Sequence, residues 1–226
     1  MQAEKPSQTA SMVAALRGLA AYLPAEARLV EDPYGLAFGG KLARGAARML
    51  ELAPELSRKL TSTWQSKNVL WLQLRTRAID DALRAFAADG GKQVVLLGAG
   101  FDCRALRMRE QLPGVQFFEV DHPATQAEKK RVLSELRAES PARYLAWNFE
   151  QDPMPELPAR LSALGLDRTQ RVFTVWEGVS MYLTEPAIVA TLATVRAYAP
   201  PSSQLVFTYI ERAGLARPSF VSRLVA

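Results

Sequence analysis

The segment 93–100, with the sequence QVVLLGAG, constrains the fold of this chain more than any other feature. Its first five residues form a short apolar run, which is typical of a strand buried on both faces, as in parallel sheets. Gly98-Ala99-Gly100 then ends the run, and glycines at this place allow a tight turn and a close approach of backbone to a ligand. A short helix is predicted to begin near Asp102. The segment therefore predicts a strand, a ligand-binding loop and a helix in succession.

Similar runs predict further strands downstream. They lie at 115–120, 144–149, 172–176 and 204–210, with helices predicted at 129–138 and 185–198. Strands that alternate with helices indicate βαβ units, right-handed crossovers and a mostly parallel sheet. The predicted fold class is therefore α/β, with a Rossmann-like sheet.

The first third of the chain reads as helical and is expected to cap one end of that sheet. Helices are predicted over about 12–19, 41–60 and 65–88, and the turn EDPYG at 31–35 separates the first two. Residues 1–90 are thus predicted to form a helical cap with a lead-in helix, packed on a core of residues 91–226. The segment 211–226 shows no strand pair, so the core is expected to lack its last strands and to leave an open edge at 204–210. If the chain is complete, a homodimer through that edge is expected.

The glycine loop and the acid after the next strand point to an adenosine-containing cofactor. Asp121 ends the second predicted strand, and a carboxylate there can accept hydrogen bonds from both hydroxyls of a ribose. The dinucleotide fingerprint has a third glycine where this chain has Cys103, and Asp102 would repel a pyrophosphate at the helix start. S-adenosylmethionine carries no phosphate, so the loop favours it over a nicotinamide dinucleotide. The alternative interpretation is that the glycines serve only to form a turn and that no cofactor binds there.

Composition argues against several other classes of protein. One cysteine and one histidine allow neither an internal disulfide nor a Cys/His zinc cluster, so no metal is predicted, and Cys103 is expected to pack as a small apolar residue. No apolar run reaches the ~18 residues of a membrane span, and Arg17 interrupts the apolar N-terminal stretch, so a cytoplasmic protein without membrane contact is expected. The net charge of +5 is interspersed and the aromatic residues are scattered. The basic run 129–131 is expected to be a solvated helix face, and nucleic acid is not an expected partner.

Four segments carry a resemblance to a known family: LRTRAIDDALRAF, QVVLLGAGFDCRALRM, FFEVDHP and VWEGVSMYLTEP. In this order and spacing they resemble the leucine carboxyl methyltransferase-like family, and more closely its bacterial branch of S-adenosylmethionine-dependent O-methyltransferases. QTASMVAALRG and EDPYGLAF are similar to the same branch. The resemblance covers most of the chain. It implies a class I methyltransferase sheet with an N-terminal helical cap, and S-adenosylmethionine as the cofactor.

The resemblance also implies roles for single residues. Arg75 matches an arginine that holds the methionine carboxylate of the cofactor, a task suited to a guanidinium fork. Gly98 and Gly100 match glycines of the cofactor loop, and Asp121 matches the acid that binds the ribose. Glu177 matches a glutamate near the methionine moiety. The alternative for Arg75 is a surface arginine whose stem packs on the cap. The alternative for Glu177 is an acid that caps the next helix.

Other positions match less well or rank lower. Asn148 and Phe149 stand where the family has an aspartate and an apolar residue that clasp the adenine; an amide oxygen can still accept a hydrogen bond from the adenine amino group. The family's N-terminal contact would fall near Gln8. Arg77 and Glu119 are secondary candidates. Arg77 lies two residues after Arg75 in the predicted helix, and Glu119 lies two residues before Asp121 in the predicted strand.

Candidates for catalysis carry less evidence. His122, beside the ribose acid, can serve as a general base, contact the cofactor or cap the next helix. Tyr182 can face the acceptor or pack. The segment 178–182, GVSMY, is no nucleophile elbow, because tyrosine stands where the strained turn needs glycine.

The predicted function is S-adenosylmethionine-dependent O-methyl transfer to a carboxylate or hydroxyl of a small molecule or secondary metabolite. A carboxylate acceptor needs no base, whereas a hydroxyl acceptor does. A catalytically silent protein that binds the cofactor and an NAD(P)-dependent oxidoreductase are the alternatives. Arg75→Ala should abolish cofactor binding under the first interpretation and matter little to an oxidoreductase.

Overall fold

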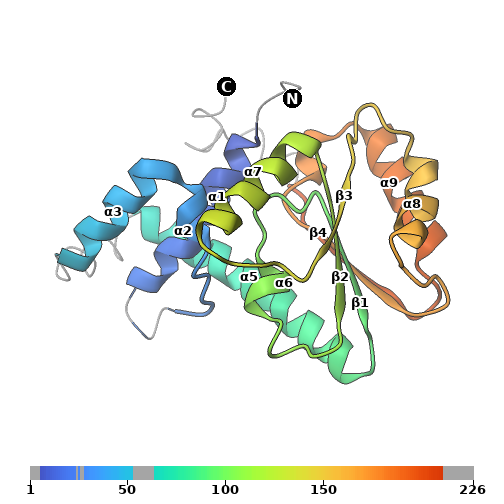
Figure 1. Cartoon of the computed structure of the whole chain (residues 1–226), viewed down its shortest axis with the longest axis horizontal. Helices are drawn as coiled ribbons and strands as arrows, with labels where there is room; N and C mark the ends of the chain where they lie inside the picture. Colours follow the sequence, from blue (N-terminus) through green and yellow to red (C-terminus); the bar gives the residue numbers. More distant parts are fainter. Residues whose placement is uncertain (1–5, 24, 26–27, 53–63, 211–226) are drawn as a thin grey trace.

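A parallel sheet forms the centre of the molecule (Figure 1). The computed structural model describes residues 6–23, 25, 28–52 and 64–210. Its strands are β1 (Gln93–Leu97), β2 (Gln116–Asp121), β3 (Arg143–Ala146), β4 (Val172–Trp176) and β5 (Gln204–Phe207). They are ordered β3-β2-β1-β4-β5, and all the neighbouring pairs are parallel. The carboxyl ends of the strands therefore share one edge, and the strand order reverses between β1 and β4.

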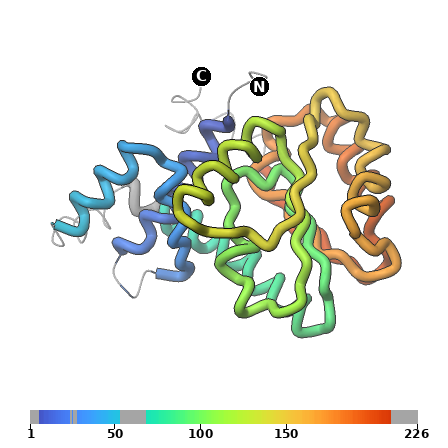
Figure 2. The backbone as a smooth tube through the Cα atoms, in the orientation of Figure 1, coloured from blue at the N-terminus to red at the C-terminus, as the bar shows by residue number. Residues whose placement is uncertain are grey.

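Helices cover both faces of the sheet, because β1 is apolar on both sides. Val94 and Leu96 pack with α5 (Trp64–Ala88) and α6 (Arg104–Arg107), whereas Val95 and Leu97 pack with α8 (Leu157–Ala163) and α9 (Glu185–Tyr198). Successive side chains of a strand point to opposite faces, which gives the two separate core clusters. The backbone trace shows the same layers, with α8 and α9 on the side away from α5 (Figure 2).

The N-terminal helices form a cap against the α6 side of the core. They are α1 (Gln8–Leu19), the 3₁₀ turn η1 (Ala20–Tyr22), α2 (Gly35–Phe38) and α3 (Gly40–Leu52). Phe38 of α2 stacks on Phe101 of the loop after β1 with ring centroids 4.5 Å apart. Ala14 and Cys103 belong to the same apolar cluster, so the lone cysteine packs as a small apolar residue. α3 extends away from the sheet (Figure 1).

The predicted fold class, α/β with a parallel sheet and an N-terminal helical cap, is confirmed. β1, β4 and α9 coincide with their predicted bounds, while β3 and β5 each end three residues earlier than predicted. α7 (Pro123–Glu135) begins six residues before its predicted start, and α8 was not predicted. Part of the predicted helix 41–60 lies outside the described residues, as does the segment 211–226. Within the described part of the chain, no helix is both long and apolar enough to cross a membrane.

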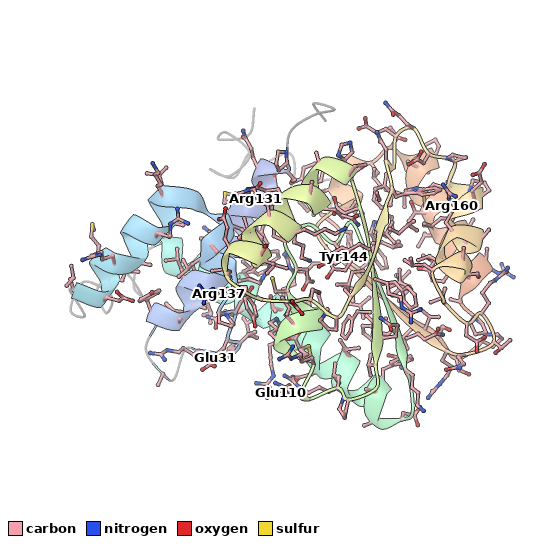
Figure 3. All side chains as sticks on the ribbon, viewed as in Figure 1. Glu31, Glu110, Arg131, Arg137, Tyr144 and Arg160 are labelled. Atoms are coloured by element: carbon pink, nitrogen blue, oxygen red, sulfur yellow. The ribbon has the colours of Figure 1, made fainter. Side chains whose placement is uncertain are left out.

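The prediction of a solvated basic face at 129–131 is wrong for its first residue. Lys129 is 1% exposed, and its Nζ donates to Glu119 Oε2 at 2.5 Å and to the carbonyl of Asp102. Arg131 lies on the surface, as predicted, where it pairs with neighbouring acids of α7 (Figure 3). The charge run alone did not reveal that Glu119, on β2, faces Lys129 inside the core.

Candidate functional site

The loops after β1, β2 and β4 meet at the carboxyl edge of the sheet, where the strand order reverses. The amides of Gly98 and Ala99 donate to the carbonyl of Val120 in β2, at 2.9 and 3.1 Å. On the other side, Val179 of the loop after β4 packs against Gly98. The glycine loop is therefore held between the two neighbouring strands at the place where open α/β sheets bind ligands.

Both loop glycines have a backbone conformation that other residues rarely adopt. Gly98 has φ of 65° and Gly100 has φ of 51°. A Cβ on Gly98 would lie less than 3.0 Å from Val179, and one on Gly100 would lie 3.1 Å from Ala10 of α1. The glycines thus serve both the turn and the close approach of α1 and of the loop after β4.

Asp121 lies directly beside this loop. Its Oδ2 accepts a hydrogen bond from the amide of Gly100 at 2.5 Å, and its Oδ1 accepts one from the amide of His122 at 2.6 Å. Burial raises the pKa of Asp121, and the two amide donors partly offset that rise. Each carboxylate oxygen has a second lone pair, so the group can still accept hydroxyl donors from a ligand.

Arg75 and Glu177 form an ion pair at the same edge of the sheet. Arg75 projects from α5, Glu177 follows β4, and both Nε and Nη2 of Arg75 lie 2.7 Å from Glu177 Oε1. The guanidinium also rests on the ring of Trp71, 4.8 Å from its centroid. A guanidinium next to a carboxylate matches the two charged ends of an amino acid, its carboxylate and its ammonium group.

A second arginine lies behind this pair. Arg104 donates through Nη1 to Glu177 Oε2 at 2.8 Å and to the carboxylate of Asp102, and through Nε to Asp80 Oδ1 at 2.8 Å. Arg107 binds the same Asp80, at 2.5 and 2.8 Å. Burial alone would raise the pKa of Glu177, but Arg104 and then Arg75 outweigh it and hold the pKa below its usual range. Glu177 is therefore ionised at neutral pH.

The cap is tied to the site by Arg17 of α1. Its Nη2 donates to the carbonyl of Phe101 at 2.8 Å, and its Nε donates to Asp32 Oδ2 at 3.0 Å. Asp32 also accepts hydrogen bonds from the amides of Tyr34 and Gly35, so the predicted EDPYG turn is built around this side chain. Arg17, predicted only to interrupt an apolar stretch, is one of the residues that hold α1 over the glycine loop.

The predicted adenine contacts lie after β3. Asn148 Oδ1 accepts a hydrogen bond from the amide of Glu150 at 3.0 Å, and Asp152 Oδ2 accepts one from the amide of Asn148 at 2.7 Å. Phe149 is half-buried against the core cluster of α8 and α9. Asn148 and Phe149 thus form a compact turn at the same sheet edge as Asp121.

Comparisons with known proteins identify the family of this chain. The family model described as leucine carboxyl methyltransferase matches residues 10–196. The chain belongs to the leucine carboxyl methyltransferase family. Two relatives named "Putative S-adenosyl-L-methionine-dependent methyltransferase" come from Streptomyces coelicolor and Streptomyces avermitilis. Each is 34% identical, over 88% and 85% of this chain and 64% and 65% of the relative. The chain therefore spans slightly less than two thirds of the length of these relatives.

Solved structures support the fold of this family member. A crystal structure of a "putative methyltransferase" from Thermobifida fusca is similar with a TM-score of 0.53 and 18% identity, over 87% of this chain and 70% of the other. A duf574 family protein from Streptomyces avermitilis gives a TM-score of 0.50 and 17% identity, over 80% and 67%. At this level of identity the likeness shows the fold alone.

The two residues predicted as candidates for catalysis, His122 and Tyr182, follow β2 and β4. His122 is buried at the start of α7, and its Nδ1 accepts a hydrogen bond from the amide of Ala124 at 3.2 Å. The ring therefore carries its proton on Nε2, and helix capping is the role that the structure shows. Tyr182 is 62% exposed in the 3₁₀ turn η4 (Ser180–Tyr182). Ser180 donates to the carbonyl of Thr208 at 2.5 Å and holds that turn against the end of β5.

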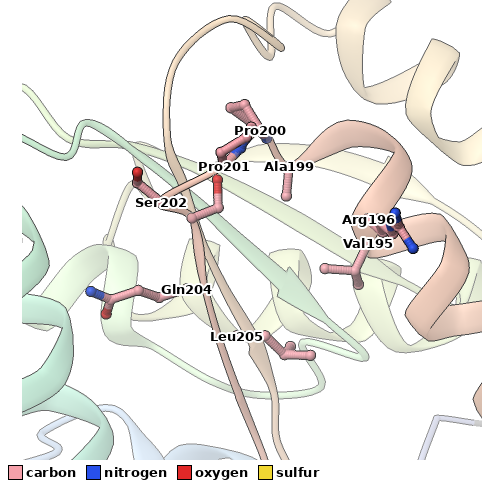
Figure 4. A pocket seen from close by; sticks show the side chains of 9 residues that line it. Val195, Arg196, Ala199, Pro200, Pro201, Ser202, Gln204 and Leu205 are labelled. Atoms are coloured by element: carbon pink, nitrogen blue, oxygen red, sulfur yellow. The ribbon is translucent and has the colours of Figure 1, made fainter.

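Two of the three lower-ranked candidates pair with other residues, and the third is exposed. Arg77 is 51% exposed and pairs with Asp81 on the surface of α5. Glu119 is committed to Lys129, and Gln8 is exposed at the start of α1. Two surface hollows also lie elsewhere. One of about 370 Å³ is formed by the end of α9 and the start of β5 (Figure 4), and one of about 420 Å³ lies between α7 and β3.

Sequence reasoning missed the buried charges behind Arg75 and Glu177. Asp80 and Arg104 both lie within the segments that carry the family resemblance, but the resemblance assigned neither of them a role. The same helix carries the exposed charges Arg77, Asp81 and Arg84, so the sequence does not distinguish the buried Asp80 from them. The partners of Asp80 and Arg104 come from other elements, and no local pattern names them.

Proposed function

We propose that this chain binds S-adenosylmethionine at the carboxyl edge of its sheet and transfers the methyl group to an oxygen atom of a small acceptor. The observation that carries the proposal is the Arg75–Glu177 pair at the sheet edge that also holds Asp121 and the glycine loop. An ionised guanidinium and an ionised carboxylate suit the two ends of the methionine moiety. A carboxylate at the end of β2 suits the ribose.

The residues present fit this cofactor better than they fit a dinucleotide. Arg75 would hold the methionine carboxylate, Glu177 the ammonium group, Asp121 the ribose, and the turn of Asn148 and Phe149 the adenine. Asp102 Oδ1 already accepts the amide of Arg104 at 2.8 Å, so the start of α6 presents a carboxylate where a pyrophosphate would need donors. When bound, the cofactor supplies a methyl group that its sulfonium has already activated.

The protein's part in methyl transfer is alignment and exclusion of water. The cap is tied to the glycine loop by Arg17 and by the Phe38–Phe101 stack, which supports an acceptor site between the cap and the edge of the sheet. His122 caps a helix and leaves no acceptor nitrogen on its ring, which favours an acceptor that needs no base. We therefore propose a carboxylate, or an acidic enol or phenol, as the acceptor. Tyr182 is exposed and lies five residues after Glu177. We propose that Tyr182 contacts the acceptor.

The names of the relatives support a methyltransferase that uses S-adenosylmethionine. Because the chain spans less than two thirds of their length, the activity itself is part of the proposal. A protein that binds the cofactor without catalysis is the second candidate, favoured by His122, the predicted base, whose Nδ1 is engaged in capping α7.

Calorimetry with S-adenosylmethionine, S-adenosylhomocysteine and NAD tests the cofactor. We expect micromolar binding of the first two ligands and none of NAD, and we expect Arg75→Ala and Asp121→Ala to abolish it. Arg77→Ala, on the same helix but on the surface, is the matched control and should bind as the parent does. Binding of NAD alone would overturn the proposal.

Transfer of labelled methyl to a panel of carboxylic acids and phenols then separates enzyme from silent binder. A labelled ester or ether supports the proposed activity. Tight cofactor binding with no labelled product from any acceptor would favour the silent binder.

A further inference from the structure

We propose that Arg104 is a positioning residue, which holds Glu177 in place for the cofactor's ammonium group while Arg75 turns to the cofactor's carboxylate. The inference rests on the proposed function, and it concerns a residue with no expected contact with the ligand. It follows from the way in which Glu177 divides its two oxygens between two arginines.

The two arginines bind Glu177 from opposite sides. Arg75 uses Nε and Nη2 on Oε1, both at 2.7 Å, whereas Arg104 uses Nη1 on Oε2 at 2.8 Å. The side chain of Arg75 is 13% exposed and that of Arg104 is 1% exposed. Oε1 is therefore bound by the more exposed of the two arginines, and Oε2 by the fully buried one.

Arg75 cannot serve both the glutamate and the ligand in full. A guanidinium fork that binds the methionine carboxylate gives up donors that now point to Glu177 Oε1. That oxygen is then free to accept the ammonium group of the cofactor. The bond from Arg104 to Oε2 is independent of this exchange, so it keeps the carboxylate oriented throughout.

Arg104 is itself fixed at several points, which a positioning role requires. Its Nε donates to Asp80 Oδ1, its Nη1 also donates to Asp102, and its own backbone amide is bound by Asp102 Oδ1. Arg107 grips Asp80 from another side through both Nη1 and Nη2. Arg104 therefore cannot follow a ligand outward as Arg75 can.

Arg107 supplies a matched control. Like Arg104, it is an arginine of α6 bound to Asp80, and its side chain is 7% exposed. Both of its terminal nitrogens bind Asp80, and its Nε has no hydrogen-bond partner among the described residues. Arg104→Lys and Arg107→Lys both weaken the contact with Asp80. Only Arg104→Lys also removes the fork that spans Asp80, Asp102 and Glu177.

The experiment compares two ligands by calorimetry on the whole chain. S-adenosylhomocysteine has the amino-acid end, whereas 5′-methylthioadenosine has the same adenosine and sulfur without it. We expect R104K to weaken S-adenosylhomocysteine about 10- to 100-fold, the loss of a charge-assisted hydrogen bond, and to change methylthioadenosine less than about 3-fold. R107K should change neither ligand by more than about 3-fold. In an E177Q background, R104K should add little, because the two residues act as one unit.

Several outcomes overturn the inference. They are unchanged S-adenosylhomocysteine affinity in R104K, an equal loss for both ligands, and an equal loss in R104K and R107K. If R104K does not fold, R104Q, which is also too short to reach Glu177, carries the same expectation. A parent chain that binds neither adenosine ligand refutes the proposed function. A parent that binds S-adenosylhomocysteine while R104K binds it equally well refutes only the role of Arg104.

Discussion

Substitution of Gly98 by alanine tests how the glycine loop is built, because the structure separates its cost into two parts. The first part is conformational: Gly98 has φ of 65°, and an L-residue in this region loses about 1–2 kcal/mol. The second part is steric, because the new Cβ would lie less than 3.0 Å from Val179 Cγ2, and overpacking of this kind costs about 1–3 kcal/mol. The expected loss in the free energy of unfolding is therefore about 2–5 kcal/mol.

Urea unfolding of a small set of variants isolates each part. Gly114 has φ of 77°, and no atom lies within 4 Å of the place that a Cβ would take there, so Gly114→Ala should show the conformational cost alone, about 1–2 kcal/mol. Gly98→Ala should cost more than that. Val179→Ala, measured alone and combined with Gly98→Ala, completes a double-mutant cycle. The steric part of the loss should disappear in the double variant, because the methyl group that overlaps the Cβ is gone.

Two results would refute this reasoning. One is a loss for Gly98→Ala no larger than that for Gly114→Ala, since the contact with Val179 would then carry no cost. The other is strict additivity of Gly98→Ala and Val179→Ala, since relief of the overlap must appear as a coupling energy. Either result would mean that the loops after β1 and β4 are not in firm contact at the sheet edge.

Three further predictions concern the cap, the ribose acid and the sheet edge. Arg17→Met should lower the free energy of unfolding in urea by about 3–5 kcal/mol, because it leaves Asp32 charged and buried. Arg77→Met, at a surface arginine, is the control. If both variants lower the free energy of unfolding by the same small amount, the role given to Arg17 is contradicted. Calorimetric affinity for S-adenosylhomocysteine should fall as the pH drops toward the pKa of Asp121, which burial raises. Only the ionised carboxylate offers both oxygens to the ribose, so Asp121→Asn should flatten that dependence. The homodimer through the β5 edge, expected if the chain is complete, stays a prediction, and a monomeric mass by light scattering at high concentration would contradict it.

The sequence predicted strands best where an apolar run ends at a glycine or an acid. β1 is such a run, followed by Gly98, and β4 is another, followed by Glu177, and both coincide with their predicted bounds. β3 ends early because the chain turns at Asn148, whose carbonyl accepts the amides of residues 151 and 152. Apolar periodicity does not report such a turn, since the residues within it remain partly apolar.

Helix starts were harder to predict when a cap rather than an apolar pattern defines them. α7 begins at Pro123 because His122 accepts the amide of Ala124 and proline is well suited to the first helical position. The first turns of α7 carry few apolar residues, so the predicted helix began only at Lys129. The same lack of pattern hid Lys129 itself, whose burial depends on Glu119 of another element.

The contacts in the site that could not be predicted from the sequence are those between residues far apart in the chain. Arg75 and Glu177 are 102 residues apart, and Arg17 and Phe101 are 84 apart. The resemblance named Arg75 and Glu177 as separate contacts with a cofactor. That they contact each other, with Arg104 behind them, depends on α5, α6 and the end of β4 meeting at one edge. That meeting is a consequence of topology, which local patterns do not contain.

The balance of charge in this cluster bears on which ligand the edge can accept. Four arginines and four acids meet there: Arg17, Arg75, Arg104, Arg107, Asp32, Asp80, Asp102 and Glu177. Buried charges are tolerated only when each has a partner, so a ligand with surplus negative charge would find no spare cation among these residues. A pyrophosphate brings such a surplus, whereas the methionine end of S-adenosylmethionine brings one carboxylate against an ammonium group and the sulfonium, and so no surplus of negative charge. If Arg75 and Glu177 exchange their internal ion pair for two pairs with the amino-acid end of the ligand, the cluster stays paired, and on this ground we expect that end to bind in preference to a pyrophosphate.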